Sequence, residues 1–255
     1  MSENAQPHPP RAALVTGASR GIGRAIAEVL GEEGYALTIT ARDPDRLERA
    51  AGEMRAHGYD VAPFAGDLTR TDDIKALAAH HMERWGRLDV LVNNAGIAHI
   101  VPVEELTPDY TDLMLATNLR AVILLYGECL PMLRAAGAEH DNALVVNIAS
   151  ISGKHGEATL GAYSAAKAGV IGYTEAMNEE LNPSGIKSVA LCPGYVDTDM
   201  AADAKDTAVP VEQMLKTQDL AEAVRFLLKV SPACLVPEII QQRRYRQASD
   251  LSSSL

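Results

Sequence analysis

Near its amino end the chain reads Ala12-Ala13-Leu14-Val15-Thr16-Gly17-Ala18-Ser19-Arg20-Gly21-Ile22-Gly23. The first five residues are a short β-rich run, which predicts a buried strand, and the glycine-rich turn after it opens into a helix. Glycines remove the Cβ atoms that would block a pyrophosphate, and free N–H groups at a helix start attract its charge. The stretch predicts a phosphate-binding turn, although its Gly-x-x-x-Gly-x-Gly spacing differs from the commoner Gly-x-Gly-x-x-Gly pattern.

The rest of the chain repeats this alternation of strand and helix. Strands are predicted at Ala12–Thr16, Ala36–Thr40, Val61–Phe64, Val90–Asn93, Ala143–Ile148, Ser188–Leu191 and Val236–Ile240. Helices are predicted at Gly23–Glu33, Asp45–His57, Thr71–Trp85, Pro108–Ala136, Tyr163–Leu181 and Gln218–Leu228. Several strands are nearly continuous apolar runs, as expected when helices cover both faces of a parallel sheet. We therefore expect an α/β fold, doubly wound around a predominantly parallel, seven-stranded sheet with helices on both faces.

No internal repeat or long linker divides the chain, so we expect one domain over residues 11–241. Residues 1–10 are rich in proline and are predicted to form a flexible tail. Residues 242–255, which end in a serine run, are predicted to form a second flexible tail. The stretch 198–217 has weak periodicity directly after a strand end, where we expect a substrate lid.

Composition narrows the class of protein. The formal net charge is −11, which argues against nucleic acid or an anionic membrane surface as the main partner. The amino end lacks the features of a signal peptide. The longest apolar stretch, Ala121–Leu133, is too short to span a bilayer and is predicted to be a buried helix. These features predict a cytoplasmic protein with no membrane partner.

Cysteine and histidine usage predicts neither disulfides nor a metal site. The three cysteines, Cys129, Cys192 and Cys234, form no Cys-x-x-Cys pair and are expected to be reduced. His80 and His81 lie in a charged amphipathic stretch without ligand partners at metal spacing, so we expect both on the surface.

Tyr163 and Lys167 carry the clearest chemical signal. They stand four residues apart, about one helical turn, so the phenol and the ammonium share a helix face. A tyrosine has a pKa of about 10, and a nearby cation favours the phenolate. We expect Lys167 to lower the pKa of Tyr163, as acid–base chemistry near neutral pH requires. The spacing alone is common on solvated helices, so this prediction depends on the motifs upstream.

The end of the second predicted strand indicates the type of dinucleotide. Folds that prefer NAD usually carry an acidic residue there, whereas this strand runs into Ala41 and Arg42. Arg20 in the glycine turn lies close to the same corner, and two guanidiniums suit a 2′-phosphate. The pattern favours NADP(H). NAD(H) stays open because Asp43, the next residue, would repel that phosphate if it folded back.

Five motifs follow one another in order. They are Thr16 to Gly23, Asn93-Asn94-Ala95-Gly96, Ser150 thirteen residues before Tyr163, Tyr163-(x)3-Lys167, and Pro193-Gly194-Tyr195-Val196-Asp197-Thr198. With these motifs in this order, the chain resembles the classical short-chain dehydrogenase/reductase family over nearly its whole length. The resemblance implies a single-domain Rossmann fold and hydride transfer between a nicotinamide and a carbonyl or secondary alcohol.

The resemblance also implies a role for each matching residue. Tyr163 would exchange a proton with the substrate oxygen, Ser150 would hydrogen-bond that oxygen, and Lys167 would bond the nicotinamide ribose. Asn118 would keep a water beside the lysine. The implied cofactor contacts are Gly17, Ser19, Arg20, Gly21, Ile22, Gly23, Arg42, Asp67, Leu68, Asn94, Ala95, Gly96, Tyr163, Lys167, Pro193, Gly194, Val196 and Thr198.

Several alternatives remain beside these roles. Ser152 is a second candidate for the pocket hydroxyl. The alternative for Asn118 is a side chain that only bonds backbone, and the alternative for Asp67 is a turn residue without a cofactor contact. Cys192, at a strand end near the predicted nicotinamide site, is read as a small buried thiol. His99, His155 and Tyr195 fall in loops that face either the substrate or solvent.

The leading prediction is an NADP(H)-dependent enzyme for a small carbonyl or alcohol substrate. One rival is a 3-oxoacyl-carrier-protein reductase, which the carboxyl end disfavours because Val236–Gln241 lacks the glycine pair frequent in such reductases. A rival of another class is a non-catalytic nucleotide-binding sensor, which would be expected to have lost Tyr163 or Lys167. The two longest predicted helices, 108–136 and 163–181, imply a homodimer or homotetramer.

Overall fold

A seven-stranded sheet forms the centre of the molecule, with the strand order β3-β2-β1-β4-β5-β6-β7. The computed structural model describes residues 10–200 and 209–244. The strands are β1 Ala12–Thr16, β2 Ala36–Ala41, β3 Val61–Ala65, β4 Val90–Asn93, β5 Ala143–Ile148, β6 Ile186–Pro193 and β7 Glu238–Gln241. Every neighbouring pair is parallel. The predicted doubly wound parallel sheet is confirmed.

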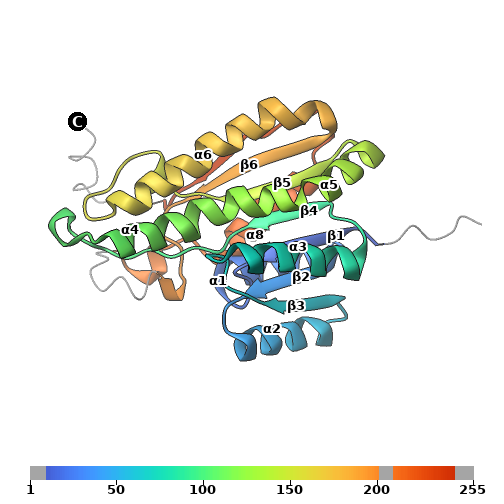
Figure 1. The fold of residues 1–255 in the computed structure, drawn as a ribbon, viewed down its shortest axis with the longest axis horizontal. Coiled ribbons are helices and arrows are strands. Elements are labelled where there is room, and N and C mark those ends of the chain that lie inside the picture. The colour runs from blue at the N-terminus through green and yellow to red at the C-terminus, as the bar shows by residue number, and fades with distance from the viewer. Residues whose placement is uncertain (1–9, 201–208, 245–255) are drawn as a thin grey trace, which may run out of the picture.

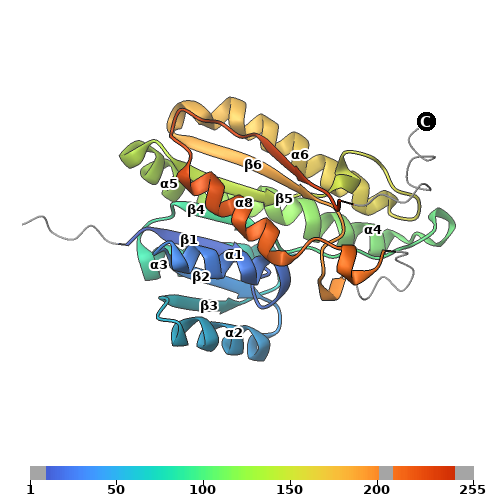
Figure 2. The same cartoon turned by 180° about the vertical axis from the view of Figure 1, so that it is seen from behind.

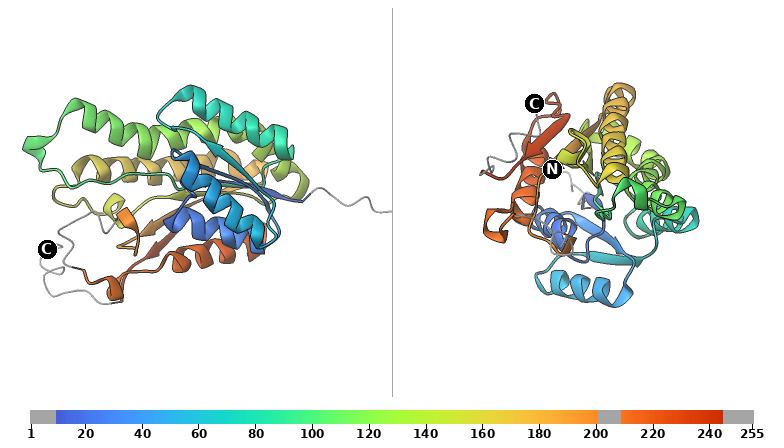
Figure 3. Two further views of the ribbon diagram at one scale, coloured as in Figure 1. Left: turned by 90° about the horizontal axis from the view of Figure 1, so that it is seen from below. Right: turned by 90° about the vertical axis from the view of Figure 1, so that its left-hand side faces the viewer.

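Helices cover both faces of this sheet (Figures 1 and 2). The helices are α1 Gly21–Glu32, α2 Pro44–Ala56, α3 Thr71–Trp85, α4 Pro108–Leu115, α5 Ala121–His140, α6 Gly161–Leu181 and α8 Thr217–Lys229. α1, α2 and α8 pack on one face, and α3, α5 and α6 pack on the other, as the view from below in Figure 3 shows. The result is a three-layer sandwich.

The strands are apolar on both sides because each side faces a different helical layer. In β1, Ala13 and Val15 belong to the core under α1 and α8, whereas Leu14 between them belongs to the core under α3 and α5. All five residues of β1 are buried. Successive side chains of a strand point to opposite faces, so a central strand of such a sandwich needs apolar residues at every position.

The buried carboxylate of Asp89 joins three segments of the chain near the start of β1. Asp89 accepts hydrogen bonds from the Ala12 N–H at 2.8 Å, from the Arg87 guanidinium at 2.7 and 2.8 Å, and from His140 Nε2 at 2.8 Å. Burial opposes ionisation of Asp89, but these hydrogen bonds outweigh it and lower the carboxyl pKa. His140 thereby anchors the last turn of α5.

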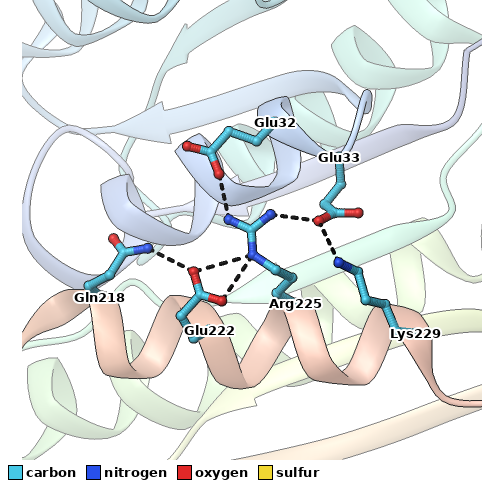
Figure 4. A network of polar contacts seen from close by, with 6 residues as sticks. All are labelled: Glu32, Glu33, Gln218, Glu222, Arg225 and Lys229. Carbon is cyan, nitrogen blue, oxygen red and sulfur yellow. Dashed lines mark hydrogen bonds and ion pairs between the residues drawn. The ribbon is translucent and has the colours of Figure 1, made fainter.

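A second polar network lies on the surface and joins α8 to the end of α1 (Figure 4). Arg225 pairs with Glu32 and Glu33 of the α1 end and with Glu222 of its own helix, and Lys229 reaches Glu33 at 3.2 Å. The four residues Arg225, Glu32, Glu222 and Lys229 are partly exposed, so water screens these pairs and they contribute little stability each.

Several predicted boundaries are wrong by one or two residues, as in the strand predicted at Val236–Ile240 and observed at Glu238–Gln241, and two elements differ more. The helix predicted to end at Ala136 continues to His140 and contains a π-helical turn, Ala116–Arg120, between α4 and α5. The strand predicted as Ser188–Leu191 extends over Ile186–Pro193. Lys187 concealed its start, because a lysine in a strand reads as solvent-facing, yet here its Nζ is satisfied by the carbonyls of Ser231 and Cys234 at 3.1 and 3.2 Å.

The surface prediction for His81 is also wrong. His81 is fully buried under the sheet, where Nδ1 lies 2.8 Å from Thr38 Oγ1 and Nε2 lies 2.9 Å from the Arg87 carbonyl. Burial lowers its pKa to about 4, so the ring is neutral at physiological pH. His80, its neighbour, is half-buried and stacks obliquely on Phe64.

The long helical segment 108–140 is apolar enough to invite comparison with a membrane span. It has 33 residues, and its most apolar window has a mean hydropathy of 1.4. In the fold, its side chains Leu125, Tyr126, Cys129 and Leu133 are fully buried against α3 and the sheet. The segment is the core helix predicted from Ala121–Leu133.

Parts of the predicted tails and lid lie outside the described residues, namely 1–9, 201–208 and 245–255. Within the predicted lid, Val211–Gln213 forms a short 3-10 helix and Thr217 begins α8. The lid and the two tails stay predictions.

Candidate active site

A cleft of about 1430 Å³ opens at the carboxyl ends of the strands. One end is formed by the glycine turn after β1, and the other by the segments that carry Ser150 and Tyr163. We call these the glycine-turn end and the Tyr163 end. This edge of an open parallel sheet is where ligands bind in doubly wound folds. The cleft lining includes every predicted site residue, from Gly17 to Thr198, apart from Gly23, which lies beneath it.

The glycine turn is locked to the neighbouring strand by Asn94. Its Nδ2 donates to the carbonyl of Thr16 at 2.8 Å and to that of Gly17 at 3.2 Å. A Cβ on Gly17 would lie 2.9 Å from this amide, and one on Gly23 would overlap it more severely. Gly17 and Gly21 also have φ angles of 65° and 60°, which glycine adopts at least cost. Glycine is therefore required here by packing as well as by backbone geometry.

The corner after β2 presents several arginines with different partners. Arg42 is exposed and lines the cleft, and it makes no hydrogen bond or ion pair with another residue in the described part of the chain. Arg20 instead pairs with Asp199 across the cleft, and Arg46, which the motifs did not indicate, also lines it. Free guanidinium donors are thus concentrated at Arg42.

Asp43 also lines this corner of the cleft. Its carboxylate caps α2, accepting from the backbone N–H groups of Asp45 at 3.1 Å and Arg46 at 3.0 Å. The hydrogen bond from Arg46 is the largest influence on the carboxyl, and its pKa is lowered. Only Oδ1 of Asp43 is engaged by the helix start, and the carboxylate stays ionised at the cleft, so Asp43 still counts against a bound 2′-phosphate.

Asp67 follows β3, and two roles are open for it, a cofactor contact and a turn residue. It lines the cleft, and its Oδ1 also accepts from the Thr69 N–H at 2.9 Å and from Thr69 Oγ1 at 2.8 Å. These bonds, led by the backbone one, lower its pKa. It is a turn residue, yet it also faces the cleft, and Leu68 beside it is buried.

The segment after β6 forms the floor between the two ends. Pro193, Gly194, Val196 and Thr198 all line the cleft. Val196 pairs with Leu215 in an isolated parallel bridge, and Thr198 Oγ1 donates to the Val196 carbonyl at 3.3 Å. The backbone of this segment is therefore held in place from outside the cleft.

Ser150, Tyr163 and Lys167 meet at the other end. Ser150 follows β5, is 7% exposed, and caps a 3-10 helix by accepting from the Ser152 N–H at 3.2 Å. Tyr163 in α6 lines the same end of the cleft, and the Ser150 hydroxyl is close enough to lower the pKa of its phenol. Lys167, one turn further, places Nζ 5.7 Å from the Tyr163 ring centroid and donates to the Ile148 carbonyl at 2.7 Å. The structure thus brings these three predicted residues together.

The predicted lowering of the Tyr163 pKa by Lys167 is wrong for this structure. Burial raises the phenol pKa, the Ser150 hydroxyl lowers it, and the charge of Glu157 raises it further. Burial also lowers the pKa of Lys167 to about 8. The lysine is turned toward the Ile148 carbonyl rather than the phenol, so desolvation dominates both groups.

Asn118 is fully buried in the π-helical turn between α4 and α5. Its Nδ2 donates to the carbonyls of Ile97 at 3.0 Å and Met114 at 3.1 Å, and its Oδ1 accepts from the Ile97 N–H at 3.1 Å. The side chain therefore fixes the loop after β4. A Cβ on Gly96 would lie 2.7 Å from Asn118 Oδ1 and 3.7 Å from Lys167 Nζ. Because glycine has no Cβ, both side chains can approach the backbone at Gly96.

Sequence reasoning missed Glu157. This residue lines the Tyr163 end, and its Oε1 accepts from Ser152 Oγ at 2.7 Å. Ser152, the second candidate for the pocket hydroxyl, thus donates to Glu157, while the Ser150 hydroxyl lowers the pKa of Tyr163. The only available signal was position, because a loop with Ser150 at one end and Tyr163 at the other must stay near the site.

The remaining candidate residues differ in whether they line the cleft. His99 and Tyr195 line the cleft, whereas His155 is exposed outside it. Cys192 is fully buried, and burial raises its pKa to about 12, so it is a structural thiol. Within the described residues, no three His, Cys, Asp or Glu side chains are grouped as metal ligands.

Comparisons with known proteins agree with this geometry. A family model for short chain dehydrogenases matches residues 11–208. A putative ketoacyl reductase of Streptomyces coelicolor is 34% identical over 247 residues, covering 89% of this chain and 94% of the relative.

Two solved structures are also similar to the chain. An alcohol dehydrogenase from the archaeon Thermococcus sibiricus, complexed with 5-hydroxy-NADP, has a TM-score of 0.84 and 32% identity, covering 93% of this chain and 98% of the other. A 3-ketoacyl-(acyl-carrier-protein) reductase from Brucella melitensis, complexed with NADH, has a TM-score of 0.83 and 30% identity, covering 90% and 96%. With the family model matched over most of its length, the chain belongs to the short-chain dehydrogenase/reductase family.

Proposed function

We propose that this protein is an NADP(H)-dependent oxidoreductase that interconverts a carbonyl compound and a secondary alcohol. One observation carries the proposal: Ser150, Tyr163 and Lys167 converge at one end of the same cleft that has the glycine turn and Arg42 at its other end. A phosphate-binding turn and a proton-exchanging phenol in one cleft are the two parts that nicotinamide chemistry requires of a protein.

The residues of the cleft fit a dinucleotide. The glycine turn and the N-terminus of α1 would hold the pyrophosphate, because backbone N–H groups there have no helical acceptor. Asp67, Leu68, Asn94, Ala95 and Gly96 would flank the adenosine. At the other end the nicotinamide and its ribose would be held by Tyr163, Lys167, Pro193, Gly194, Val196 and Thr198.

The preference for NADP(H) rests on Arg42 and Arg46. Arg42 has guanidinium donors without a partner among the described residues, and a 2′-phosphate is the ligand that uses them best. Asp43 shares the corner with one oxygen turned to the N–H groups that start α2, and the two guanidiniums of Arg42 and Arg46 outnumber its single negative charge there. The similar structure with 5-hydroxy-NADP supports this preference, while the one with NADH shows that relatives of comparable similarity accept the other dinucleotide.

The chain's own groups manage the substrate oxygen. When bound, the reduced cofactor supplies the hydride that reaches the carbonyl carbon. Tyr163 donates its phenolic proton to the oxygen as negative charge develops there, and Ser150 donates a second hydrogen bond to it. Lys167 contributes positive charge beside the phenolate that remains, and its spare N–H groups bond the ribose hydroxyls.

The direction of the Tyr163 shift favours reduction. A raised pKa keeps the phenol protonated through neutral pH, which is the form that donates a proton to a carbonyl oxygen. Oxidation needs the phenolate, so it is expected to gain rate only as the pH rises. Asn118 would act by holding the loop at Ile97, beside which a water could return the proton through Lys167.

A second candidate is the reduction of a 3-oxoacyl thioester on a carrier protein. The names of the Streptomyces and Brucella relatives support it. The charge of this chain weighs against it, since the formal net charge is −11 and an acidic carrier would be repelled. We keep a small carbonyl or alcohol compound as the leading substrate class. We also infer a homodimer or homotetramer, in which exposed Leu113 and Ile123 of α4 and α5 would be covered.

The test begins with binding. Purified protein is titrated with NADPH and with NADH while nicotinamide fluorescence is followed, and Arg42→Ala is titrated alongside. Tight NADPH binding that Arg42→Ala weakens, followed by NADPH oxidation with a panel of ketones and aldehydes, supports the proposal. Binding of both dinucleotides without turnover of any carbonyl would favour a non-catalytic sensor, and equal affinity for both would remove the preference for NADP(H).

A further inference from the structure

The Tyr163 end of the cleft contains a carboxylate for which the proposed reaction has no use. Glu157 is half-buried and lines the cleft together with Ser152 and Leu160. Its backbone N–H is 3.3 Å from Ser164 Oγ in the first turn of α6, which holds the loop against the helix that carries Tyr163. Its position is therefore fixed by the same helix as the proposed proton donor.

A short chain of hydroxyls connects this carboxylate to the reacting groups. Ser152 Oγ donates to Glu157 Oε1 at 2.7 Å, and Ser150 Oγ donates to Ser152 Oγ at 3.3 Å. Ser150 in turn lines the cleft together with Tyr163, and its hydroxyl lowers the pKa of that phenol. The carboxylate consequently lies two hydrogen-bond lengths from the oxygen of Ser150, which is the group proposed to touch the substrate oxygen.

No cation neutralises Glu157. Its side chain forms no ion pair with any residue in the described part of the chain, and only Oε1 has a hydrogen-bond donor there. Lys167 is turned to the Ile148 carbonyl, and the other acidic residues of this half, Asp197 and Asp199, are already paired with Lys216 and Arg20. Oε2 of Glu157 is thus the uncommitted charged acceptor at this end of the described cleft.

We propose that Glu157 is a specificity-determining residue that selects carbonyl substrates carrying an ammonium or hydroxyl group within a few bonds of the reacting carbonyl. A hydrogen bond to a charged acceptor is about twice as strong as a neutral one, and a donor on the substrate would supply Oε2 with a partner that it lacks among the described residues. A substrate with a carboxylate at the same place would be repelled. The inference rests on the proposed function, because it assumes that the substrate carbonyl lies against Ser150 and Tyr163.

The influence of Glu157 on the pKa of Tyr163 supports a short distance between this carboxylate and the reacting groups. The charge of Glu157 contributes to the raised phenol pKa, so its field reaches the reacting groups. The other groups that face Tyr163 are the ammonium of Lys167 on α6 and the hydroxyl of Ser150 after β5. Cys192 on β6 affects Lys167. None of these offers a second anion toward the substrate, since the Cys192 pKa of about 12 keeps that thiol neutral.

Four ketones with one skeleton test the proposal. In CH3–CO–CH2–X, X is an ammonium (aminoacetone), a hydroxyl (hydroxyacetone), a methyl (2-butanone) or a carboxylate (acetoacetate). kcat/KM is measured with NADPH at pH 7 for wild type, Glu157→Gln and Glu105→Gln. Glu105 is an exposed carboxylate in the short helix Val103–Glu105, away from the cleft lining, so its variant is the matched control for loss of one surface charge.

The expected order in wild type is ammonium first, hydroxyl second, methyl third and carboxylate last. Glu157→Gln should reduce the preference for ammonium over methyl by about tenfold or more and should improve the carboxylate substrate, whereas Glu105→Gln should keep the wild-type order. An unchanged order in Glu157→Gln would overturn the proposal. So would a wild type that reduces other ketones but prefers acetoacetate or is inactive on all four.

Ser152→Ala separates selection from simple support of Ser150. If Glu157 acts only by holding Ser152, then Ser152→Ala and Glu157→Gln will both lower kcat/KM by one common factor for all four ketones, and the proposal fails. The proposal requires a change that depends on X in Glu157→Gln and a uniform change in Ser152→Ala. NADPH titration of each variant checks folding and the cofactor site, and a wild type that binds no dinucleotide would overturn the proposed function itself.

Discussion

The two ends of the cleft are built in different ways. At the glycine-turn end, short motifs supply backbone N–H groups from one continuous segment, and the exposed arginines Arg20, Arg42 and Arg46 reach in from the surface. At the Tyr163 end, buried side chains from β5, α6 and the π-helical turn meet through hydrogen bonds with one another and with the backbone. The first end recognises charge with adaptable groups, whereas the second depends on fixed geometry and desolvation. Mutations should therefore affect binding at the first end and chemistry at the second.

The largest effect should come from Tyr163→Phe at the buried end. Loss of the proton donor is expected to lower kcat/KM for carbonyl reduction by about 10²- to 10⁴-fold, the usual contribution of general acid–base catalysis. NADPH affinity should fall far less than kcat/KM, because the variant loses one contact to the nicotinamide ribose while the glycine-turn end is untouched. Steady-state kinetics beside a fluorescence titration measures both. Retention of full turnover would show that Tyr163 is not the proton donor.

Asn118→Ala tests whether the buried end is held by its polar contacts. The substitution leaves the Ile97 N–H and carbonyl without their side-chain partners, which is expected to cost about 1–3 kcal/mol in the free energy of unfolding. A urea melt followed by circular dichroism gives the change in midpoint. A matched variant at an exposed asparagine, Asn182→Ala, should leave the midpoint where it is, and an equal midpoint for Asn118→Ala would mean that the loop after β4 is supported elsewhere.

Arg42→Ala tests the adaptable end. A hydrogen bond to a charged group is worth about 1.5–3 kcal/mol, so NADPH affinity should fall by roughly tenfold to a hundredfold. NADH affinity should stay within a factor of two or so, because NADH lacks the 2′-phosphate. Arg225→Ala, in the surface network that joins α8 to the end of α1, is the control for loss of a guanidinium. An equal loss for both dinucleotides would point to a general effect on the corner and not to phosphate recognition.

The smallest effect concerns pH. The charge of Glu157 helps to raise the pKa of Tyr163, so Glu157→Gln should lower that pKa. Oxidation of an alcohol requires the phenolate, and the rising limb of its kcat/KM against pH should therefore move to lower pH in the variant. Ser150 and Lys167 face the same phenol and are left in place. A limb that stays put, or moves to higher pH, would mean that Glu157 has no electrostatic influence on Tyr163 in the working enzyme.

Most of the fold follows from local patterns. The limits of β1, β4, β5 and α3 agree with those predicted, because apolar runs between turn residues define buried strands without help from elsewhere. Lys187 and His81 were misjudged for one common reason. Each has a polar side chain, which is usually exposed. In the tertiary fold, carbonyl or hydroxyl groups hydrogen-bond to it and so offset the cost of its burial.

The sequence by itself determined the glycine turn, the Tyr163–Lys167 helix face and the absence of an acidic residue at the end of β2, since each is set by spacing within one segment. Only the tertiary structure decided which neighbours those residues have. It engaged Asp43 at a helix start, turned Lys167 toward Ile148, and placed Glu157 beside Ser152. Burial and long-range hydrogen bonds set pKa values and the orientation of side chains, and both arise only when distant segments pack together.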